Sequence, residues 1–323
     1  MAREPLECGV PNEGSSRRAT SLGLLSILIW STTVAASRLV MEGFGVFPGA
    51  AVVLLAAGVL LFSATCLRYR GAGWIRRLSV PHLVRAGPVF VVYMLSMYGA
   101  VGLARTRVEG IVGGLANYIW PTLILVFSVL LLRARPRAAP LVLGSALALV
   151  GIGIGASVNA GGISKLAAAL RNPTLSLGLG LVAGVAWGLY SVLGRLHRQA
   201  VPSGALSLFL LAAGGVMAAI GMRQWGQIDA DLATVLVAIY MACLPTSLAY
   251  WLWDLAMKDG DVPALGAASN LIPVLSASLA IALLGVGWQW ELILGAGLVS
   301  LGAAVARWAF RESGARRADV ELR

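Results

Sequence analysis

The sequence predicts an all-α integral membrane protein in which ten transmembrane helices form two inverted five-helix repeats, with both termini in the cytoplasm. Two observations predict this fold class. Hydrophobic residues make up 59% of the 323 residues and charged residues only 12%, which is about half the charged share of a soluble domain. Two apolar segments also share one pattern: Trp30 precedes Arg38 by eight residues, as Trp187 precedes Arg195.

Ten segments are long and apolar enough to cross a membrane. A spanning helix needs about 20 apolar residues, and segments of this kind leave no room for a soluble domain. The expected spans are 20–41, 47–67, 82–104, 110–132, 138–156, 175–194, 203–222, 232–257, 263–286 and 291–310.

These spans divide the chain into two halves. We expect a cytoplasmic tail over 1–19, a five-helix repeat over 20–156, an inter-repeat loop over 157–174, a second repeat over 175–310 and a cytoplasmic tail over 311–323. Because five is odd, the halves must lie inverted in the bilayer. Inverted repeats are typical of transporters with a substrate site near the midplane. Chance alignment of Gly- and Ala-rich helices is the alternative, and the repeated order of landmarks across several spans argues against it.

Charge sets the expected orientation. Most of the 25 lysines and arginines fall in the two tails and in the loops at 68–77, 133–137 and 195–198, which would all face one side. By the positive-inside rule that side is the cytoplasm. The net charge of +11 therefore reflects topology, and no nucleic-acid partner is expected. The polar first twenty residues do not resemble a cleavable signal peptide.

Equivalent faces of the first and sixth spans carry polar and aromatic side chains. Trp30 and Thr33 share a helical face, and Trp187 and Tyr190 lie at the corresponding position of the second half. Tryptophan favours the membrane interfaces, so indoles near mid-span favour a substrate cavity. The alternative is that they fill space between helices.

Two prolines interrupt the fourth and ninth spans. Pro121 and Pro273 remove a backbone donor and displace the carbonyl four residues earlier, where Asn117, Ser269 and Asn270 stand. These polar side chains either bind substrate or satisfy the backbone at the kink.

Three further aromatic residues complete the expected cavity lining. Tyr98 lies in the third span, and Tyr118 and Trp120 flank the first helix break. The last two point to different sides of their helix, which favours Trp120 as the residue that faces the cavity.

Few ionisable groups lie within the spans. Asp254 is the one carboxylate well inside a predicted span, and Lys258 at i+4 could pair with it. Asp254 and His82, at the start of the third span, are candidates for coupling or gating. A proton-relay chain is not visible, so coupling would be weak or supplied by the substrate gradient. Cysteine spacing indicates no metal site, and no cofactor is expected.

The residues resemble a known family. The five-plus-five plan and the Asn…Pro motif of the fourth span in each half resemble the drug/metabolite transporter superfamily, in its EamA-like branch. Three segments are similar to the YddG-type bacterial exporters: 30–32 with 42–43, Asn117–Pro121, and 273–277. The resemblance implies a multi-pass exporter of aromatic amino acids in the bacterial inner membrane that also passes the dication paraquat. It also implies a central cavity lined by Trp30, Tyr118, Trp120, Trp187 and Ser269.

We therefore expect export of aromatic and related neutral amino acids by alternating access, and no enzymatic activity. A broader exporter of organic cations or small metabolites is the alternative within the class. From other classes, an intramembrane enzyme is an alternative, but this sequence has no paired catalytic groups. A channel is a further alternative, and its flux would not saturate. The partners expected are the small-molecule substrate and the lipid bilayer. A monomer is compatible with this interpretation, and the sequence leaves the oligomeric state open.

Overall fold

The computed structural model describes residues 13–132, 137–158, 161–162, 164, 173–196, 202–259, 265 and 268–321, and within them the regular structure is helical. The first half contains α1 (Glu13–Ser31), α2 (Thr33–Phe44), α3 (Val46–Arg68), the short η1 (Ala72–Arg77), α4 (Val80–Gly102), α5 (Arg107–Asn117), α6 (Trp120–Leu132) and α7 (Ala138–Ser157). The second contains α9 (Leu175–Leu196), α10 (Pro202–Ile220), η4 (Trp225–Gln227), α11 (Leu232–Cys243), η5 (Leu244–Leu248), α12 (Ala249–Asp259), η6 (Ser269–Leu271), α14 (Ile272–Leu283) and α15 (Trp290–Glu321).

Seven of these helical segments are long and apolar enough to cross a membrane, or eight if the bent pair α1–α2 is one span. The segments expected as the seventh and ninth spans are shorter apolar helices in the described residues, Gly204–Ile220 and Ser269–Leu283. The last helix, α15, continues to Glu321, well past the expected end of the tenth span. The structure is thus an all-helical membrane protein.

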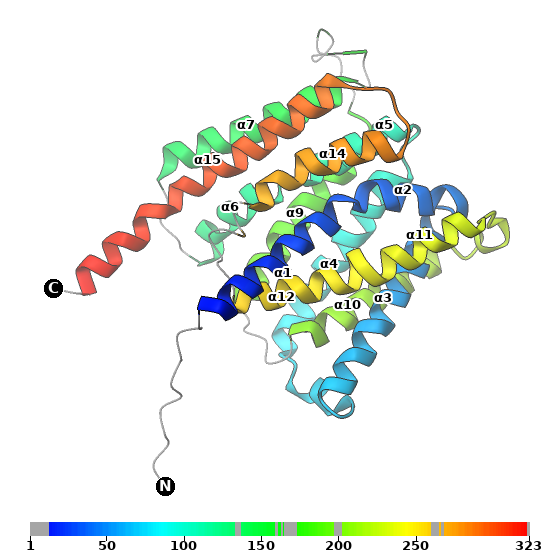
Figure 1. Ribbon diagram of the computed structural model, residues 1–323, viewed down its shortest axis with the longest axis horizontal. Coiled ribbons are helices and arrows are strands. Elements are labelled where there is room, and N and C mark those ends of the chain that lie inside the picture. Colours follow the sequence, from blue (N-terminus) through cyan, green and yellow to red (C-terminus); the bar gives the residue numbers. More distant parts are fainter. Residues whose placement is uncertain are drawn as a thin grey trace.

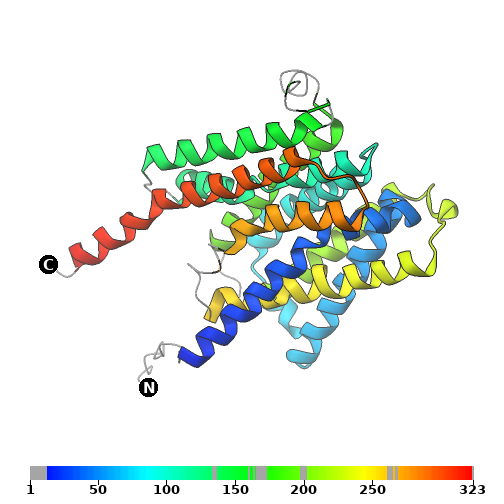
Figure 2. The same cartoon turned by 45° about the horizontal axis from the view of Figure 1, so that its top comes forward.

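Helices pack in pairs that join the two halves of the chain. The closest pairs are α7 with α15, α3 with α10, α4 with α9, and α1 with α12. Figures 1 and 2 show α7 and α15 side by side along one edge of the molecule, with the other helices gathered beside them.

Glycine permits the closest of these crossings. A Cβ on Gly151 of α7 would lie 2.6 Å from the carbonyl oxygen of Gly295 of α15, and the reverse is equally true. In lipid, where hydrophobic burial does not drive helix association, small residues allow the backbone approach that stabilises a helix pair.

Several spans are broken near their middle. Helices α1 and α2 meet at an angle of 41°, and the Thr32 hydroxyl donates to the carbonyl of Ile29 at the break (2.7 Å). The break between α5 and α6 covers residues 118–119, so Pro121 is the second residue of α6, and α14 has Pro273 in its first turn. A fourth irregularity is the π-helical turn η5, which contains Pro245.

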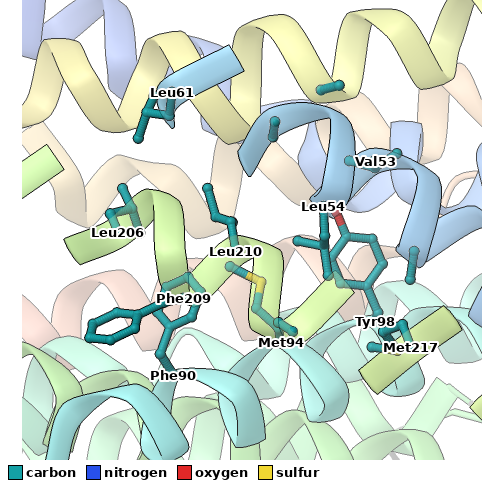
Figure 3. Close-up of a cluster of buried hydrophobic side chains, with 14 of the residues drawn as sticks. Val53, Leu54, Leu61, Phe90, Met94, Tyr98, Leu206, Phe209, Leu210 and Met217 are labelled. Carbon is teal, nitrogen blue, oxygen red and sulfur yellow. The ribbon is translucent and has the colours of Figure 1, made fainter. Parts of the chain in front are cut away.

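A hydrophobic core lies where α3, α4 and α10 meet. Leu54, Phe90, Met94, Phe209 and Leu210 are buried there and point toward one another (Figure 3). This core holds α4 in place, and α4 carries several of the aromatic rings described next.

Candidate functional site

The site is a network of aromatic rings centred on Trp187 of α9. Its indole lies 4.7 Å from the ring of Tyr93, 5.4 Å from Tyr190, 5.8 Å from Tyr250 and 6.5 Å from Trp120, between ring centroids. These distances fall within the range at which aromatic pairs attract one another. The five rings come from α4, α6, α9 and α12, so the network contains residues of both halves of the chain.

Trp30 of α1 joins the network through Tyr250. The two ring centroids are 5.1 Å apart, and the ring centroid of Trp253 lies 5.4 Å from that of Trp30. The indole N–H donates to the carbonyl oxygen of Pro245 (3.0 Å). A π-helical turn departs from the regular α-helical hydrogen-bond pattern, and Trp30 bonds to one of the carbonyl oxygens in this turn. Trp30 therefore has a structural bond in addition to its place beside the other rings.

The network continues toward the start of α4. Tyr190 lies 5.1 Å from Phe90, and Phe209 of α10 lies 5.9 Å from Phe90. His82, which is only 3% exposed, lies 5.6 Å from Phe209 and 6.4 Å from Tyr190. The candidate gating histidine is thus in contact with the rings, at one end of the row.

Two buried polar oxygens next to helix breaks accept no hydrogen bond from the described residues. Asn117, at the end of α5, is 4% exposed, and its side-chain oxygen accepts no hydrogen bond from the described residues. The hydroxyl oxygen of Thr33, the first residue of α2, likewise has no hydrogen-bond partner among the described residues. A buried polar group without a partner is destabilising by roughly 1–3 kcal/mol, so a polar ligand that reached either oxygen would gain that interaction.

The backbone at the α5–α6 break is packed against α9. A Cβ on Gly184 would lie 2.8 Å from the carbonyl oxygen of Asn117, so glycine at that position allows the break to approach α9. Pro121 provides no N–H for this carbonyl. The break turns the chain so that Trp120 begins α6 beside Trp187.

Two further expected site residues lie in the cores against which the ring network packs. Tyr98 is buried in the core of α3, α4 and α10, beside Leu54 and Met217 (Figure 3). Tyr118 is buried in a second core formed by α2, α5, α14 and their neighbours. No ring contact joins either residue to the described members of the network, but both interact electrostatically with Tyr93.

At the second helix break, just before α14, the polar side chains have partners. The side-chain oxygen of Asn270 accepts a hydrogen bond from Arg307 of α15 (3.2 Å). Ser269 is buried and has a polar interaction of its own. The side chains of Asp254 and Lys258 lie outside the described residues, so their expected pairing stays a prediction.

Sequence reasoning missed several rings. Tyr93, Phe90 and Phe209 were not singled out, although Phe90, Tyr93 and Met97 follow the i, i+3, i+7 spacing of one helical face. Tyr250 of α12 is likewise absent from the residues expected in the site. The π-helical turn at Pro245, which accepts the bond from Trp30, was also missed.

Comparison with known proteins places the chain among transporters. Residues 174–308 match the EamA-like transporter family. The chain is 27% identical over 301 residues to the aromatic amino acid exporter YddG of Salmonella typhimurium, covering 92% of this chain and 99% of that protein. It is 28% identical over 299 residues to the exporter of the same name from Ancylobacter novellus, covering 90% and 98%.

A solved crystal structure has the same overall arrangement. It superimposes with a TM-score of 0.65 at 26% sequence identity, covering 91% of this chain and 99% of the other. These similarities confirm the resemblance expected from the sequence. They identify a transporter and not an enzyme, in a multi-pass protein of the bacterial inner membrane.

Proposed function

Because residues 174–308 match the EamA-like transporters and the whole chain is similar to exporters named for aromatic amino acids, we propose that this protein exports aromatic and related neutral amino acids. The observation that carries the proposal is the ring network around Trp187. A planar aromatic substrate would pack among Tyr93, Trp120, Trp187, Tyr190 and Tyr250, with favourable edge or offset contacts.

The polar part of the substrate needs hydrogen-bond partners. An amino acid carries an ammonium group, which only donates, and the unpartnered oxygen of Asn117 only accepts. We place the ammonium group near Asn117, with Thr33 as a second oxygen. Ser269, Asn270, Tyr98 and Tyr118 then support the helices around this site, in addition to any contact made during the transport cycle.

Alternating access between two inverted halves, 20–156 and 175–310, is the proposed mechanism. The helix pairs support it. In a five-plus-five repeat, α1 corresponds to α9 and α4 to α12, so the packing of α1 on α12 is the counterpart of the packing of α9 on α4. A rocking motion about this pseudo-symmetry would open the site to one side at a time.

Organic cations are a second candidate substrate class. Aromatic faces attract cations within about 6 Å of the ring, and the rings around Trp187 are themselves uncharged. If organic cations bind among the same rings, they should compete with aromatic amino acids for transport. Lack of competition would indicate separate sites.

Counterflow in proteoliposomes tests the proposal. Purified protein is reconstituted with a high internal load of unlabelled phenylalanine or tryptophan, and labelled substrate is added outside without a proton gradient. We expect transient accumulation above equilibrium, which requires a carrier. Absence of accumulation for any aromatic or neutral amino acid, with protein that elutes as a single folded species, would contradict this function.

A further inference from the structure

A charged cluster holds several helix ends together on the side of the molecule away from the described ends of the chain. Glu42, near the end of α2, lies 2.9 Å from the guanidinium of Arg38 and 2.6 Å from that of Arg107, which begins α5. Arg107 contacts both carboxylate oxygens, since its Nε also donates to Glu42 (3.0 Å). This two-point contact fixes the orientation of the pair.

The same arginines bind the carboxyl ends of two other helices. Arg38 donates to the carbonyl oxygens of Val101 and Ala104 (3.0 and 2.9 Å), where α4 ends. Arg107 donates to the carbonyl oxygen of Leu284 (2.6 Å), which caps α14. Carbonyls at a helix end lack partners within the helix and carry partial negative charge, so a cation there is stabilising.

The second half contributes a further bond at this end. The N–H of Asp229, in the segment between α10 and α11, donates to the carbonyl oxygen of Gly43 (3.0 Å). The end of α2 is thus held to α4, α5, α14 and the α10–α11 connection. In Figure 1 the end of α2, the start of α5 and the end of α14 lie on the side away from the start of α1 and the end of α15.

We propose that the Glu42–Arg107 pair is a latch that closes the transport pathway at this end and separates when that end opens. The inference rests on the proposed function, and under the proposed topology this end faces the periplasm. Three features support it. The pair joins α2 to α5, Arg107 joins α5 of the first half to α14 of the second, and both side chains are partly exposed. Partly exposed ion pairs are weak enough to break during a conformational cycle.

Accessibility of a buried reporter tests the latch without any substrate. The native cysteines are replaced and Ser37, buried one turn before Met41, becomes cysteine. We expect Glu42→Gln to raise its rate of labelling by a membrane-impermeant thiol reagent about two- to fivefold, the range for loss of a partly exposed ion pair. Arg107→Gln breaks the same ion pair by changing the arginine, so it should raise the labelling rate in the same way. The double variant should then match either single variant.

Glu291→Gln is the matched control. It makes the same chemical change at the start of α15, at the same end of the molecule, and Glu291 forms no ion pair with the described residues. Labelling should stay at the rate of the parent. Equal labelling of Glu42→Gln, Arg107→Gln and the parent would overturn the latch.

Cross-linking gives an independent result. Glu42→Cys with Arg107→Cys, joined by a reducible two-armed thiol reagent, should lose counterflow, and reduction should restore it. Glu42→Cys alone, treated in the same way, should keep its transport. Transport at an unchanged rate in the cross-linked protein would refute the latch. If the parent itself shows no counterflow, the proposed function fails while the labelling result still decides the latch.

Discussion

Among the described residues, Trp187 contacts four rings: three on other helices and one, Tyr190, on its own helix. A single side chain therefore links most of the candidate site. Trp30, its counterpart in the first half, differs in having its N–H bonded to Pro245. We therefore assign recognition mainly to Trp187, and both recognition and helix support to Trp30. Asn117 differs again, because its buried oxygen has no partner among the described residues.

Replacing Trp187 by alanine should reduce counterflow of phenylalanine about tenfold or more. Aromatic pairs contribute roughly 0.5–1.5 kcal/mol each beyond the burial of area, and a tenfold change corresponds to about 1.4 kcal/mol. Trp187→Phe should keep most of the activity. Trp308→Ala is the control because that indole is 57% exposed on α15. Initial rates at equal protein content provide the measurement, and equal rates for Trp187→Ala and Trp308→Ala would rule out the assignment.

Asn117→Ala should raise the half-saturating concentration of phenylalanine about tenfold or more, because a hydrogen bond to a charged group contributes roughly 1.5–3 kcal/mol. The thermal unfolding temperature should change little, since no described bond of the side-chain oxygen is lost. If Asn117 serves only to satisfy the kinked backbone, the unfolding temperature should fall while the half-saturating concentration stays the same. Concentration-dependent counterflow and unfolding in detergent separate these outcomes.

At the scale of the element, the pairing of α7 with α15 depends on glycine. These helices meet through backbone atoms at Gly144, Gly151, Gly295 and Gly302. A side chain at such a position would force the helices apart and remove the contacts of the whole pair.

Gly151→Leu should therefore destabilise the protein, by roughly 1–3 kcal/mol as for other overpacked positions. Gly297→Leu, on α15, is a close control because a Cβ there meets no atom within 4 Å. Fluorescence-detected gel filtration after heating gives the comparison. If both variants unfold at the same temperature, the packing of α7 on α15 does not limit the stability of the protein.

Sequence predicted the broken spans to different degrees. Pro121 and Pro273 were recognisable because each follows asparagine within one helical turn in matching positions of the two halves. The α1–α2 bend was not foreseen, since it contains no proline and depends on the Thr32 hydroxyl bonding Ile29 and Tyr240 (2.7 Å each). Such a bond to a distant helix leaves no local pattern in the sequence.

Sequence pattern indicated ring-network residues where an aromatic side chain stood out in an apolar span. Trp30, Trp120, Trp187 and Tyr190 were selected on this basis, and the structure places all four in the ring network. Tyr93 was missed because α4 is apolar on most of its surface, so composition does not reveal the inward face. Tyr98, five residues later, is buried in the core of α3, α4 and α10, against which Tyr93 and Trp187 also pack.

At the scale of the whole molecule, the paired helices and the breaks in corresponding positions support an inverted duplication. Five spans in each half, as we propose, would require the connection between α7 and α9 to face the opposite side from the termini.

Fusions with alkaline phosphatase and green fluorescent protein test this topology. A phosphatase inserted at Gly162 should be active, because the enzyme folds only outside the cytoplasm, and one at the C-terminus should be inactive. The fluorescent protein should give the opposite pattern. The same compartment for both positions would contradict five spans per half.

The proximity of Tyr93 and Trp187 has an optical consequence. Phenol rings absorb at shorter wavelengths than indoles and pass their excitation to an indole a few ångströms away, and these two centroids are 4.7 Å apart. Light absorbed by Tyr93 should therefore emerge as the emission of Trp187. A ligand that inserted between the rings would weaken that transfer and shift the emission colour. The difference spectrum between the parent and Trp187→Phe would thus report occupancy of the site in unlabelled protein.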